Sequence, residues 1–424
     1  MNNIRVIINR LFAAVAVLSL VLLAVSAADA RAEDQEGGAP GDWLTRYSSA
    51  RTLGMGGAFV AAADEPVGAL WNPACLGRVY QNSFQMETAR LFESTSINTI
   101  SFSTPERDLL PGFGANLLSL SSGEFERTNE FNDVMGEFKE GDLAFLLTAA
   151  KSISRQLSFG ASVKVVRQSV DEFTGTGFGA DAGVLYDPMP SLSLGVSILN
   201  IGGPNIKLRE TSEEFPNEIR GGAALRLFSG RGTISTEVAY HSWYGARLHG
   251  GAEFWVHPVM ALRIGYNDTY LSGGLSFRLP NGLQLDYAAS DHFLDVTHRI
   301  GISYSFGGYF ASSKADPEVF SPIGARSVTK IHMKSRTRAE AAVWTLKIMD
   351  KSDIVVRRFS GKGQPPAHVM WDGKDEAGLP LPDGIYRYQL TVRDAEGRVF
   401  EGPEKEIEIL TSGPQGDIPV IISQ

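Results

Sequence analysis

The sequence holds one cysteine, Cys75, among its 424 residues, so a disulfide within the chain is excluded. It also lacks a Gly-x-x-x-x-Gly-Lys-Ser/Thr phosphate loop, a His-Glu-x-x-His motif and a Gly-x-Ser-x-Gly motif. Without such motifs we expect a protein that is not an enzyme, with no catalytic residues and no cofactor or metal site. We expect Cys75 to be a small buried residue, because a reactive cysteine needs a base or a cation beside it.

The chain also lacks an excess of positive charge: it has 39 Lys and Arg against 48 Asp and Glu, a formal net charge of −9 at pH 7. A protein that binds nucleic acid normally presents a basic surface to the phosphates. We therefore do not expect nucleic acid as a partner.

Long apolar runs are absent except at the N-terminus. There Arg5 and Arg10 precede an apolar run over residues 11–28, which ends in two small-x-small patterns. This arrangement predicts a secretory signal peptide over residues 1–32, with an uncleaved anchor helix as the alternative. The rest of the chain is then expected outside the cytoplasm.

Apolar and small polar residues alternate from about residue 80 to residue 306. In "LSLGVSI" (192–198), for example, Leu, Val and Ile alternate with Ser and Gly. A period of two predicts β-strands with two unlike faces. Turn residues separate about fourteen such segments, near 80–92, 96–104, 112–122, 140–151, 156–170, 176–187, 191–201, 217–228, 231–242, 246–257, 259–267, 270–279, 281–290 and 297–306.

The expected fold class is all-β, with an antiparallel outer-membrane barrel over residues 80–306. Single-chain barrels of this kind have an even number of strands, each about 9–11 residues long across the bilayer. The second face is mostly Gly, Ser and Ala, which suits a crowded lumen. The alternative is a soluble sandwich or solenoid, which would bury the apolar face. Polar stretches at 123–139 and 202–216 are expected to be loops.

Residues 33–79 are expected to form a leader and a hatch-like segment. Since about eight strands fill their own lumen and 16–18 leave a channel, a lumen of fourteen strands is open or plugged. In "RTLGMGGAFVAAADEPVGALWNPACLG" (51–77), Asp64 is expected to cap a short helix that has Pro66 in its first turn. The glycines would let the backbone pass close to the wall. The alternative is that these residues only shape the approach to the first strand.

The pattern changes after Phe306. Residues 307–326 contain Asp-Pro and Ser-Pro and are expected to be a linker. Short strand-like segments with Asp-Gly and Glu-Gly turns follow over residues 327–410 and predict a small sandwich. Residues 411–424 are expected to be a C-terminal tail.

Residues 51–77 resemble the N-terminal signature of the PorV/PorQ family, outer-membrane barrels related in architecture to the FadL long-chain fatty acid transporters. Cys75 stands where the family usually has a glycine. The segment 295–306 resembles the family's closing strand, with His298, Tyr304 and a terminal aromatic residue, Phe306, of the kind that barrel-assembly machinery recognises. The candidate hatch residues that carry the resemblance are Gly54, Met55, Gly56, Gly57, Asp64, Glu65, Trp71, Asn72 and Pro73.

Residues 371–390 resemble the FlgD-type immunoglobulin-like domain. Such modules are attached to many exported proteins and do not define a function by themselves. The motif residues are Trp371, Asp372, Gly373, Asp383, Gly384 and Tyr386.

Three functions stay open. The resemblances imply a FadL-like channel for small hydrophobic molecules, or an envelope or secretion accessory such as a type IX secretion shuttle or scaffold. In the second case the Ig-like domain would contact periplasmic or secretion-machine proteins. The third is a purely structural barrel. In each case we expect the outer membrane of a diderm bacterium, with its lipid as a partner. The Ig-like domain is expected in the periplasm, since an even number of strands returns the chain to its starting side.

Overall fold

The computed structural model describes residues 40–46, 49–91, 94–107, 109–243, 245–279, 281–292, 294–323, 327–395 and 397–411. The expected signal peptide and almost all of the expected C-terminal tail lie outside these residues. In the described part, no helix is both long and apolar enough to span a membrane. The chain divides into two compact units between Gly308 and Tyr309.

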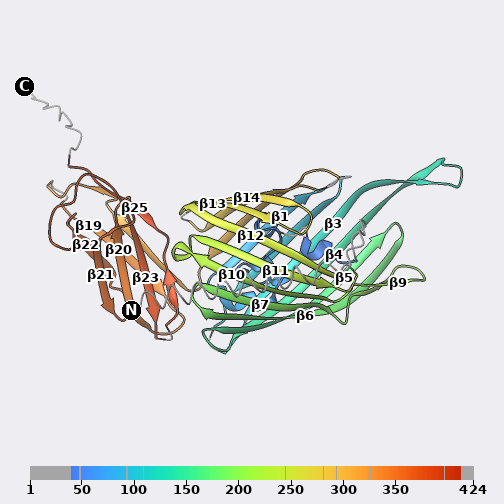
Figure 1. Ribbon diagram of the computed structural model, residues 1–424, viewed down its shortest axis with the longest axis horizontal. Helices are drawn as coiled ribbons and strands as arrows, with labels where there is room; N and C mark the ends of the chain where they lie inside the picture. Colours follow the sequence, from blue (N-terminus) through green and yellow to red (C-terminus); the bar gives the residue numbers. More distant parts are fainter. Residues whose placement is uncertain are drawn as a thin grey trace, which may run out of the picture. The chain divides into compact units, whose positions relative to one another are not determined.

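Fourteen antiparallel strands of the described N-terminal unit close into a barrel (Figure 1). β1 (Asn82–Arg90) pairs with β16 (Thr297–Phe306), and this pairing completes the ring. The predicted all-β fold with an antiparallel barrel of about fourteen strands is therefore confirmed. The other strands of the ring are β2 (Ser96–Thr104), β3 (Gly112–Thr128), β4 (Val134–Ser152), β5 (Leu157–Val170), β6 (Phe173–Met189), β7 (Leu192–Ile201), β10 (Glu218–Leu227), β11 (Gly232–His241), β12 (Gly245–His257), β13 (Met260–Tyr266), β14 (Leu271–Arg278), β15 (Leu283–Ser290).

The two faces of the barrel wall differ in polarity. In β7, Ser193 and Ser197 are buried, whereas Val196 is 52% exposed and Ile198 is 41% exposed. The closed ring and its apolar exterior overturn the soluble alternative, which would bury that face. Outward apolar side chains from around the ring include Phe84, Met86, Ile100, Phe102, Leu117, Phe145, Leu147, Val163, Ile219, Ile234, Leu262, Ile264, Leu285, Ile300 and Ile302.

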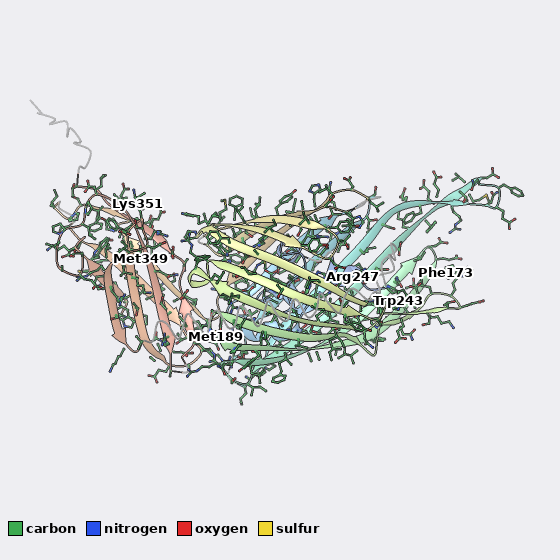
Figure 2. All side chains as sticks on the ribbon, viewed as in Figure 1. Phe173, Met189, Trp243, Arg247, Met349 and Lys351 are labelled. Carbon is green, nitrogen blue, oxygen red and sulfur yellow. The ribbon has the colours of Figure 1, made fainter. Side chains whose placement is uncertain are left out.

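The two ends of the barrel carry different connections. At the end where β1 begins and β16 ends, two to seven residues join consecutive strands. At the other end, six connections have two to six residues, and the seventh has sixteen. This long connection joins β7 to β10 and includes the short strands β8 (Asn205–Lys207) and β9 (Ser212–Glu214). Figure 2 shows Phe173 and Trp243 at this second end, and Met189 at the first.

The hairpin of β3 and β4 corrects one expectation from the sequence. Residues 123–139 are not a loop, because the ladder continues from Glu124 opposite Lys139 to Thr128 opposite Val134. Charged residues stand on both faces of this part and remove the alternation that predicts a strand. The hairpin reaches beyond its neighbouring strands at the second end (Figure 1).

The C-terminal unit is the predicted small β-sandwich. One sheet consists of β17 (Phe310–Asp316), β19 (Thr329–Arg336) and β22 (His368–Trp371). Side chains from both sheets share a core that includes Ile331, Leu346, Trp371 and Tyr388. The second sheet has the order β18 (Val319–Phe320), β25 (Lys405–Ile409), β23 (Gly384–Asp394), β20 (Ala341–Met349), β21 (Val355–Lys362), with β24 (Val399–Glu401) beside β23.

The expected linker over residues 307–326 is wrong for most of its length. β17 pairs with β19 from Phe310 to Asp316, and β18 pairs with β25, so both belong to the sandwich. The inward residues of β17 are Ala311, Ser313 and Ala315, which are too small to produce an apolar pattern. Only Gly307, Gly308 and Tyr309 separate the last barrel strand from the first strand of the sandwich.

Candidate functional site

The described N-terminal segment lies inside the barrel, and we call its residues 43–46 and 49–79 the plug. Its described elements are α2 (Trp43–Arg46), α3 (Ala50–Gly54), η1 (Pro66–Leu70) and η2 (Pro73–Arg78). α3 packs against β13, β14 and β15, whereas η2 packs against β4, β5 and β6. Most of the plug's side chains are fully buried, so it occupies space that would otherwise be open lumen.

Local capping explains the short helices of the plug. The Ser49 side chain accepts a hydrogen bond from Thr52 N–H at the start of α3, and the Asn72 side chain accepts one from Ala74 N–H at the start of η2. Pro73 follows Asn72 at the first helical position, where a missing N–H costs nothing. The expectation that Asp64 caps the Pro66 helix is wrong, because Glu65 stands at that position without a side-chain cap.

The plug backbone lies directly against the barrel wall. Gly56 has a φ of +62°, and a Cβ added there would lie 2.3 Å from the backbone nitrogen of Tyr266. Only glycine combines that conformation with so close an approach. The wall also has glycines, which lack a side chain, where the plug comes closest. Gly251 faces Met55, Gly265 faces Gly56, Gly195 faces Val60, Gly183 faces Asn72 and Gly160 faces Pro73.

An ion network centred on Arg51 connects the plug to the wall. Its guanidinium pairs with Asp64 and Glu65 of the plug, and its Nε lies 3.0 Å from Glu253 Oε2 on β12. The same Glu253 oxygen lies 2.6 Å from Arg263 Nε on β13. Because Arg263 and Glu253 are buried, removing one partner would leave charge unpaired away from water.

Two wall carboxylates hold the plug through its backbone. The N–H groups of Phe59 and Val60 donate to Glu237 Oε2 at 2.8 and 2.7 Å. Arg220 Nη1 donates to the other oxygen of Glu237 at 2.6 Å. On the opposite side of the ring, Ala50 N–H donates to Glu87 Oε2 at 2.8 Å. Backbone donors on carboxylates make charge-assisted bonds, which are stronger than neutral ones.

The Trp-Asn-Pro part of the plug is also bonded to the wall. Asn72 Nδ2 donates to the carbonyl oxygens of Val60 at 3.0 Å and of Val184, on β6, at 3.1 Å. The Trp71 carbonyl accepts from Ser197 Oγ at 2.6 Å, and its ring meets Phe59 edge to face. Asn72 therefore links two parts of the plug with one strand of the wall.

The structure separates the residues singled out in the sequence into three places. The nine candidate hatch residues all lie in the plug. His298 accompanies Tyr304 and Phe306 on the outward side of β16; its Nδ1 lies 2.9 Å from Tyr287 Oη, and the rings of the other two stack.

The Ig-like motif residues lie in the sandwich. Trp371 is buried against Phe320 and Tyr386, and its Nε1 donates to Lys374 O at 3.0 Å. Tyr386 Oη donates to Pro382 O at 2.8 Å. Asp372 accepts from Lys374 N–H, Asp383 accepts from Thr411 N–H, and Gly373 and Gly384 have positive φ. These are structural contacts within the sandwich core and its turns.

Sequence reasoning missed the wall residues that hold the plug. Glu87, Arg220, Glu237, Glu253 and Arg263 all stand on inward faces and are buried. The available signal was a charged residue on the strand face that otherwise carries Gly, Ser and Ala. Such a residue in a crowded lumen indicates a partner inside the barrel. Which residue of the plug each would meet could not be read from the alternation.

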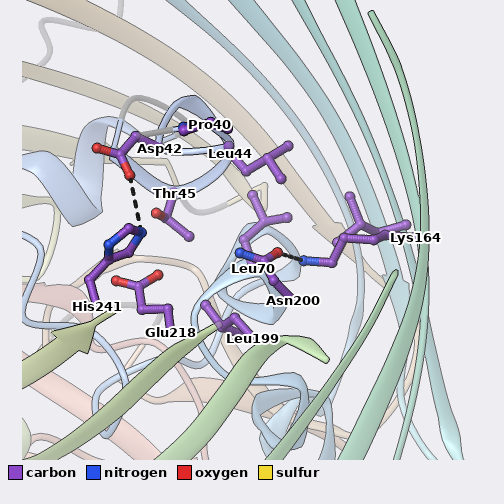
Figure 3. Close-up of a pocket in the computed structure, with 12 residues that line it drawn as sticks. Pro40, Asp42, Leu44, Thr45, Leu70, Lys164, Leu199, Asn200, Glu218 and His241 are labelled. Carbon is purple, nitrogen blue, oxygen red and sulfur yellow. Dashed lines mark hydrogen bonds and ion pairs between the residues drawn. The ribbon is translucent and has the colours of Figure 1, made fainter. Parts of the chain in front are cut away.

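Two cavities lie beside the described part of the plug. One cavity, of about 70 Å³, lies between the plug and strands β10–β13, and Thr45, Thr52, Arg220, His249 and Thr269 are among its lining residues. A smaller one of about 20 Å³ contains an Asp42–His241 contact and a bond from Lys164 Nζ to Asn200 Oδ1 (Figure 3). Both linings carry charged side chains, so they suit water or a small polar molecule better than an apolar one.

Comparison with known proteins identifies the sandwich. Residues 324–396 match the family model of the FlgD Ig-like domain. The match covers the C-terminal unit alone and leaves the barrel outside it. No curated protein sequence matches the chain.

Solved structures similar to the chain are transport barrels. The TodX ΔS2S3 mutant, a monoaromatic hydrocarbon channel, has 13% identity and a TM-score of 0.50, over 61% of this chain and 98% of its own. The Ralstonia pickettii toluene transporter TbuX has 15% identity and a TM-score of 0.49, over 62% and 99%. A Pseudomonas aeruginosa FadL homologue has 11% and 0.46, over 62% and 99%. At these identities the TodX match shows a shared barrel fold alone.

Proposed function

We propose that this chain is a non-enzymatic outer-membrane barrel with a closed lumen, which serves as an envelope or secretion accessory of the PorV/PorQ type. The observation that carries the proposal is the plug, which is held by wall carboxylates and buries most of its described side chains in the lumen. Two cavities beside it have about 20 and 70 Å³. A barrel with a filled lumen can attach the chain to the membrane but offers no open path for solutes. Its Ig-like domain then supplies the surface for protein contacts.

The polarity of the wall supports the membrane location. Around the ring, apolar side chains point outward and polar ones inward, which is the arrangement of outer-membrane barrels. In a membrane, hydrocarbon removes the apolar outward face from contact with water. In water, the same face would be a large exposed apolar surface.

The connections support an orientation. Outer-membrane barrels have short periplasmic turns and longer extracellular loops. Here every connection at the end where β16 finishes at Phe306 has seven residues or fewer, whereas the other end carries the sixteen-residue connection and the extended β3–β4 hairpin. The sandwich begins four residues after Phe306. The Ig-like domain is accordingly on the periplasmic side. Protease added to intact cells should leave it uncut, and permeabilised cells should lose it.

Conductance in planar bilayers tests the closed lumen. The purified chain should insert, migrate on gels in a heat-modifiable way and show no resolved conductance steps. Deletion of residues 43–79 should produce open-pore steps. Stable steps from the intact chain would overturn the closed-barrel proposal, and a chain that stays soluble without detergent would overturn the membrane location.

Passage of small hydrophobic molecules is a second candidate. It is supported by the fold shared with a monoaromatic hydrocarbon channel and by the cavity of about 70 Å³ beside the plug. An apolar cavity that takes benzene has about 150 Å³, so the plug would have to move before such a molecule could enter. Toluene uptake by proteoliposomes, compared with protein-free vesicles, tests this. A purely structural barrel would show neither uptake nor periplasmic partners in cross-linked cells.

A further inference from the structure

One face of the Ig-like domain is strongly basic although the chain as a whole carries −9. It is the outward face of the sheet formed by β17, β19 and β22, which we call the basic face. Every second residue of these strands points outward, because the alternate residues enter the core. The outward residues are Phe310, Ser312, Lys314, Asp316, Lys330, His332, Lys334, Arg336, His368 and Met370.

The register places one lysine and two histidines of the basic face in one row. Lys314 stands opposite His332, which stands opposite His368, and the two imidazole rings are 5.9 Å apart. Lys334 and Arg336 continue along β19 beyond this row. With four Lys or Arg residues, one Asp and both histidines neutral, the face carries a formal charge of +3.

Among the described residues of the sandwich, no ion pair involves a Lys or Arg of this face. The ion pairs of the described C-terminal unit lie elsewhere, on Lys374, Arg387 and Arg398. Of the four Lys and Arg residues of the face, only Lys330 stands directly opposite an acidic residue, Asp316. Lys314, Lys334 and Arg336 have neutral residues opposite them, so an external anion would stabilise this face.

We propose that the basic face docks on the anionic phospholipid headgroups of the leaflet beside the barrel. This inference rests on the proposed function, since it requires the barrel to be in a membrane. The short connection between β16 and β17 is the observation that favours membrane lipid over a distant partner. Phe310, the first residue of β17, follows Phe306 by four residues and so stays within about 14 Å of it. A flat face of fixed cations near a surface of phosphates gains about fivefold in binding for each Lys or Arg.

Lysine acylation of the full chain in nanodiscs tests this docking. Discs of phosphatidylcholine are compared with discs containing phosphatidylglycerol, and labelling is measured at each lysine by mass spectrometry. Lys314, Lys330 and Lys334 should be labelled about tenfold more slowly in the anionic discs, and Lys351 (Figure 2) and Lys362 at an unchanged rate. Salt at about 1 M should remove the protection, because it shortens the screening length to about 3 Å.

Matched variants separate the basic face from general charge. The triple variant Lys330→Gln, Lys334→Gln, Arg336→Gln leaves Lys314 as the reporter, which should lose its protection. The control variant Lys351→Gln, Arg358→Gln, Lys362→Gln removes the same charge from the other sheet and should keep it. Equal labelling of Lys314 in the two kinds of disc, with the barrel inserted as judged by heat-modifiable migration, overturns the inference alone. Protection by purified peptidoglycan but not by anionic discs also overturns it, since the anion is then not lipid. Failure of the barrel to insert overturns the proposed function first.

Discussion

The barrel and the Ig-like domain are built from strands with one apolar and one polar face, but they bury opposite faces. In the barrel wall the polar face is inside, where Ser197, Glu237 and Arg263 meet the plug. In the sandwich the apolar face is inside, where Ile331, Leu346 and Tyr388 form the core. The same period of two therefore produces two kinds of interior, as expected for a barrel surrounded by lipid, the location proposed above, and a sandwich surrounded by water.

The two interiors are also held together by different forces. The sandwich core gains from removing apolar area from water, which is non-directional and tolerates similar shapes. The lumen is held by hydrogen bonds and ion pairs, each of which needs a particular partner at a particular distance. Substitutions in the two regions should accordingly fail in different ways.

The largest effect is expected from Trp371→Ala in the sandwich. Trp371 is fully buried between Phe320 and Tyr386, so truncation should cost about 3–5 kcal/mol of the free energy of unfolding of that unit. Limited proteolysis of the full chain should then remove the sandwich, while the barrel keeps its heat-modifiable migration. The control is Met370→Ala on the same strand, which is 54% exposed and should change little. Loss of the barrel along with the sandwich would show that the two interiors are not independent.

A comparable effect is expected from Glu253→Gln in the lumen. Without this carboxylate, Arg51 and Arg263 lose a buried partner, which should destabilise the seated plug by about 3–5 kcal/mol. Cys75 is the only cysteine and is buried in the plug, so its reaction with maleimide reports displacement of the plug. The labelling rate should rise by about a hundredfold or more.

Glu124→Gln is the matched control for Glu253→Gln. Glu124 pairs with Lys139 on the exposed β3–β4 hairpin, where water screens the ion pair and its loss should have little effect on stability. Its Cys75 labelling should equal that of the wild type. Equal labelling in both variants would mean that packing, and not the ion network, retains the plug.

A smaller effect is expected from Ile302→Arg on the outer face. Ile302 lies near the middle of β16 and points outward, so a charge there should destabilise the lipid-inserted barrel by about 2–4 kcal/mol. Urea titration of the folded fraction in lipid, read by heat-modifiable migration, measures this. The neighbouring inward variant Ser303→Ala should stay within about 1 kcal/mol of the wild type. Tolerance of Ile302→Arg would contradict the lipid-facing assignment.

The smallest effect is the alkaline sensitivity of the sandwich. Burial raises the pKa of Tyr388, whose oxygen accepts a hydrogen bond from Ala315 N–H. The unfolded tyrosine ionises near pH 10, so the unfolded state releases its proton first and the stability falls as the pH rises above about 10. Urea unfolding of the sandwich at pH 8–11 should show this loss.

Tyr388→Phe should reduce that slope and cost about 1 kcal/mol at pH 8 through the lost hydrogen bond. Some slope should remain, because burial also raises the pKa of Tyr386. An unchanged slope in the variant would mean that Tyr388 does not ionise on unfolding in this range.

Many strands of the barrel could be predicted from the sequence because their pairing needs only regular alternation. The predicted segment 96–104 matches β2 residue for residue, and 297–306 matches β16. Prediction failed where the pattern was weak: in the charged extension of β3 and β4, and in β17, whose inward residues are alanine and serine. Backbone hydrogen bonds form these strands without help from an apolar face.

For the candidate site, local chemistry was predictable and its partners were not. The glycines of residues 54–57 and the Asn72–Pro73 pair indicated a compact segment against a wall, since each has a conformational reason for its place. The predicted capping role of Asp64 was wrong. Its carboxylate is partly exposed and pairs with Arg51 instead of accepting a hydrogen bond from a helix N-terminus.

The sequence by itself determined that the chain has about fourteen two-faced strands and then a separate unit of short strands, because alternation and turn residues act over a few positions. Only the tertiary structure decided which face of the wall is inside and what fills the lumen. Glu237 binds the N–H groups of Phe59 and Val60, although 178 and 177 residues separate it from them. Closure of the ring brings these groups together, and no local pattern records a contact over that distance.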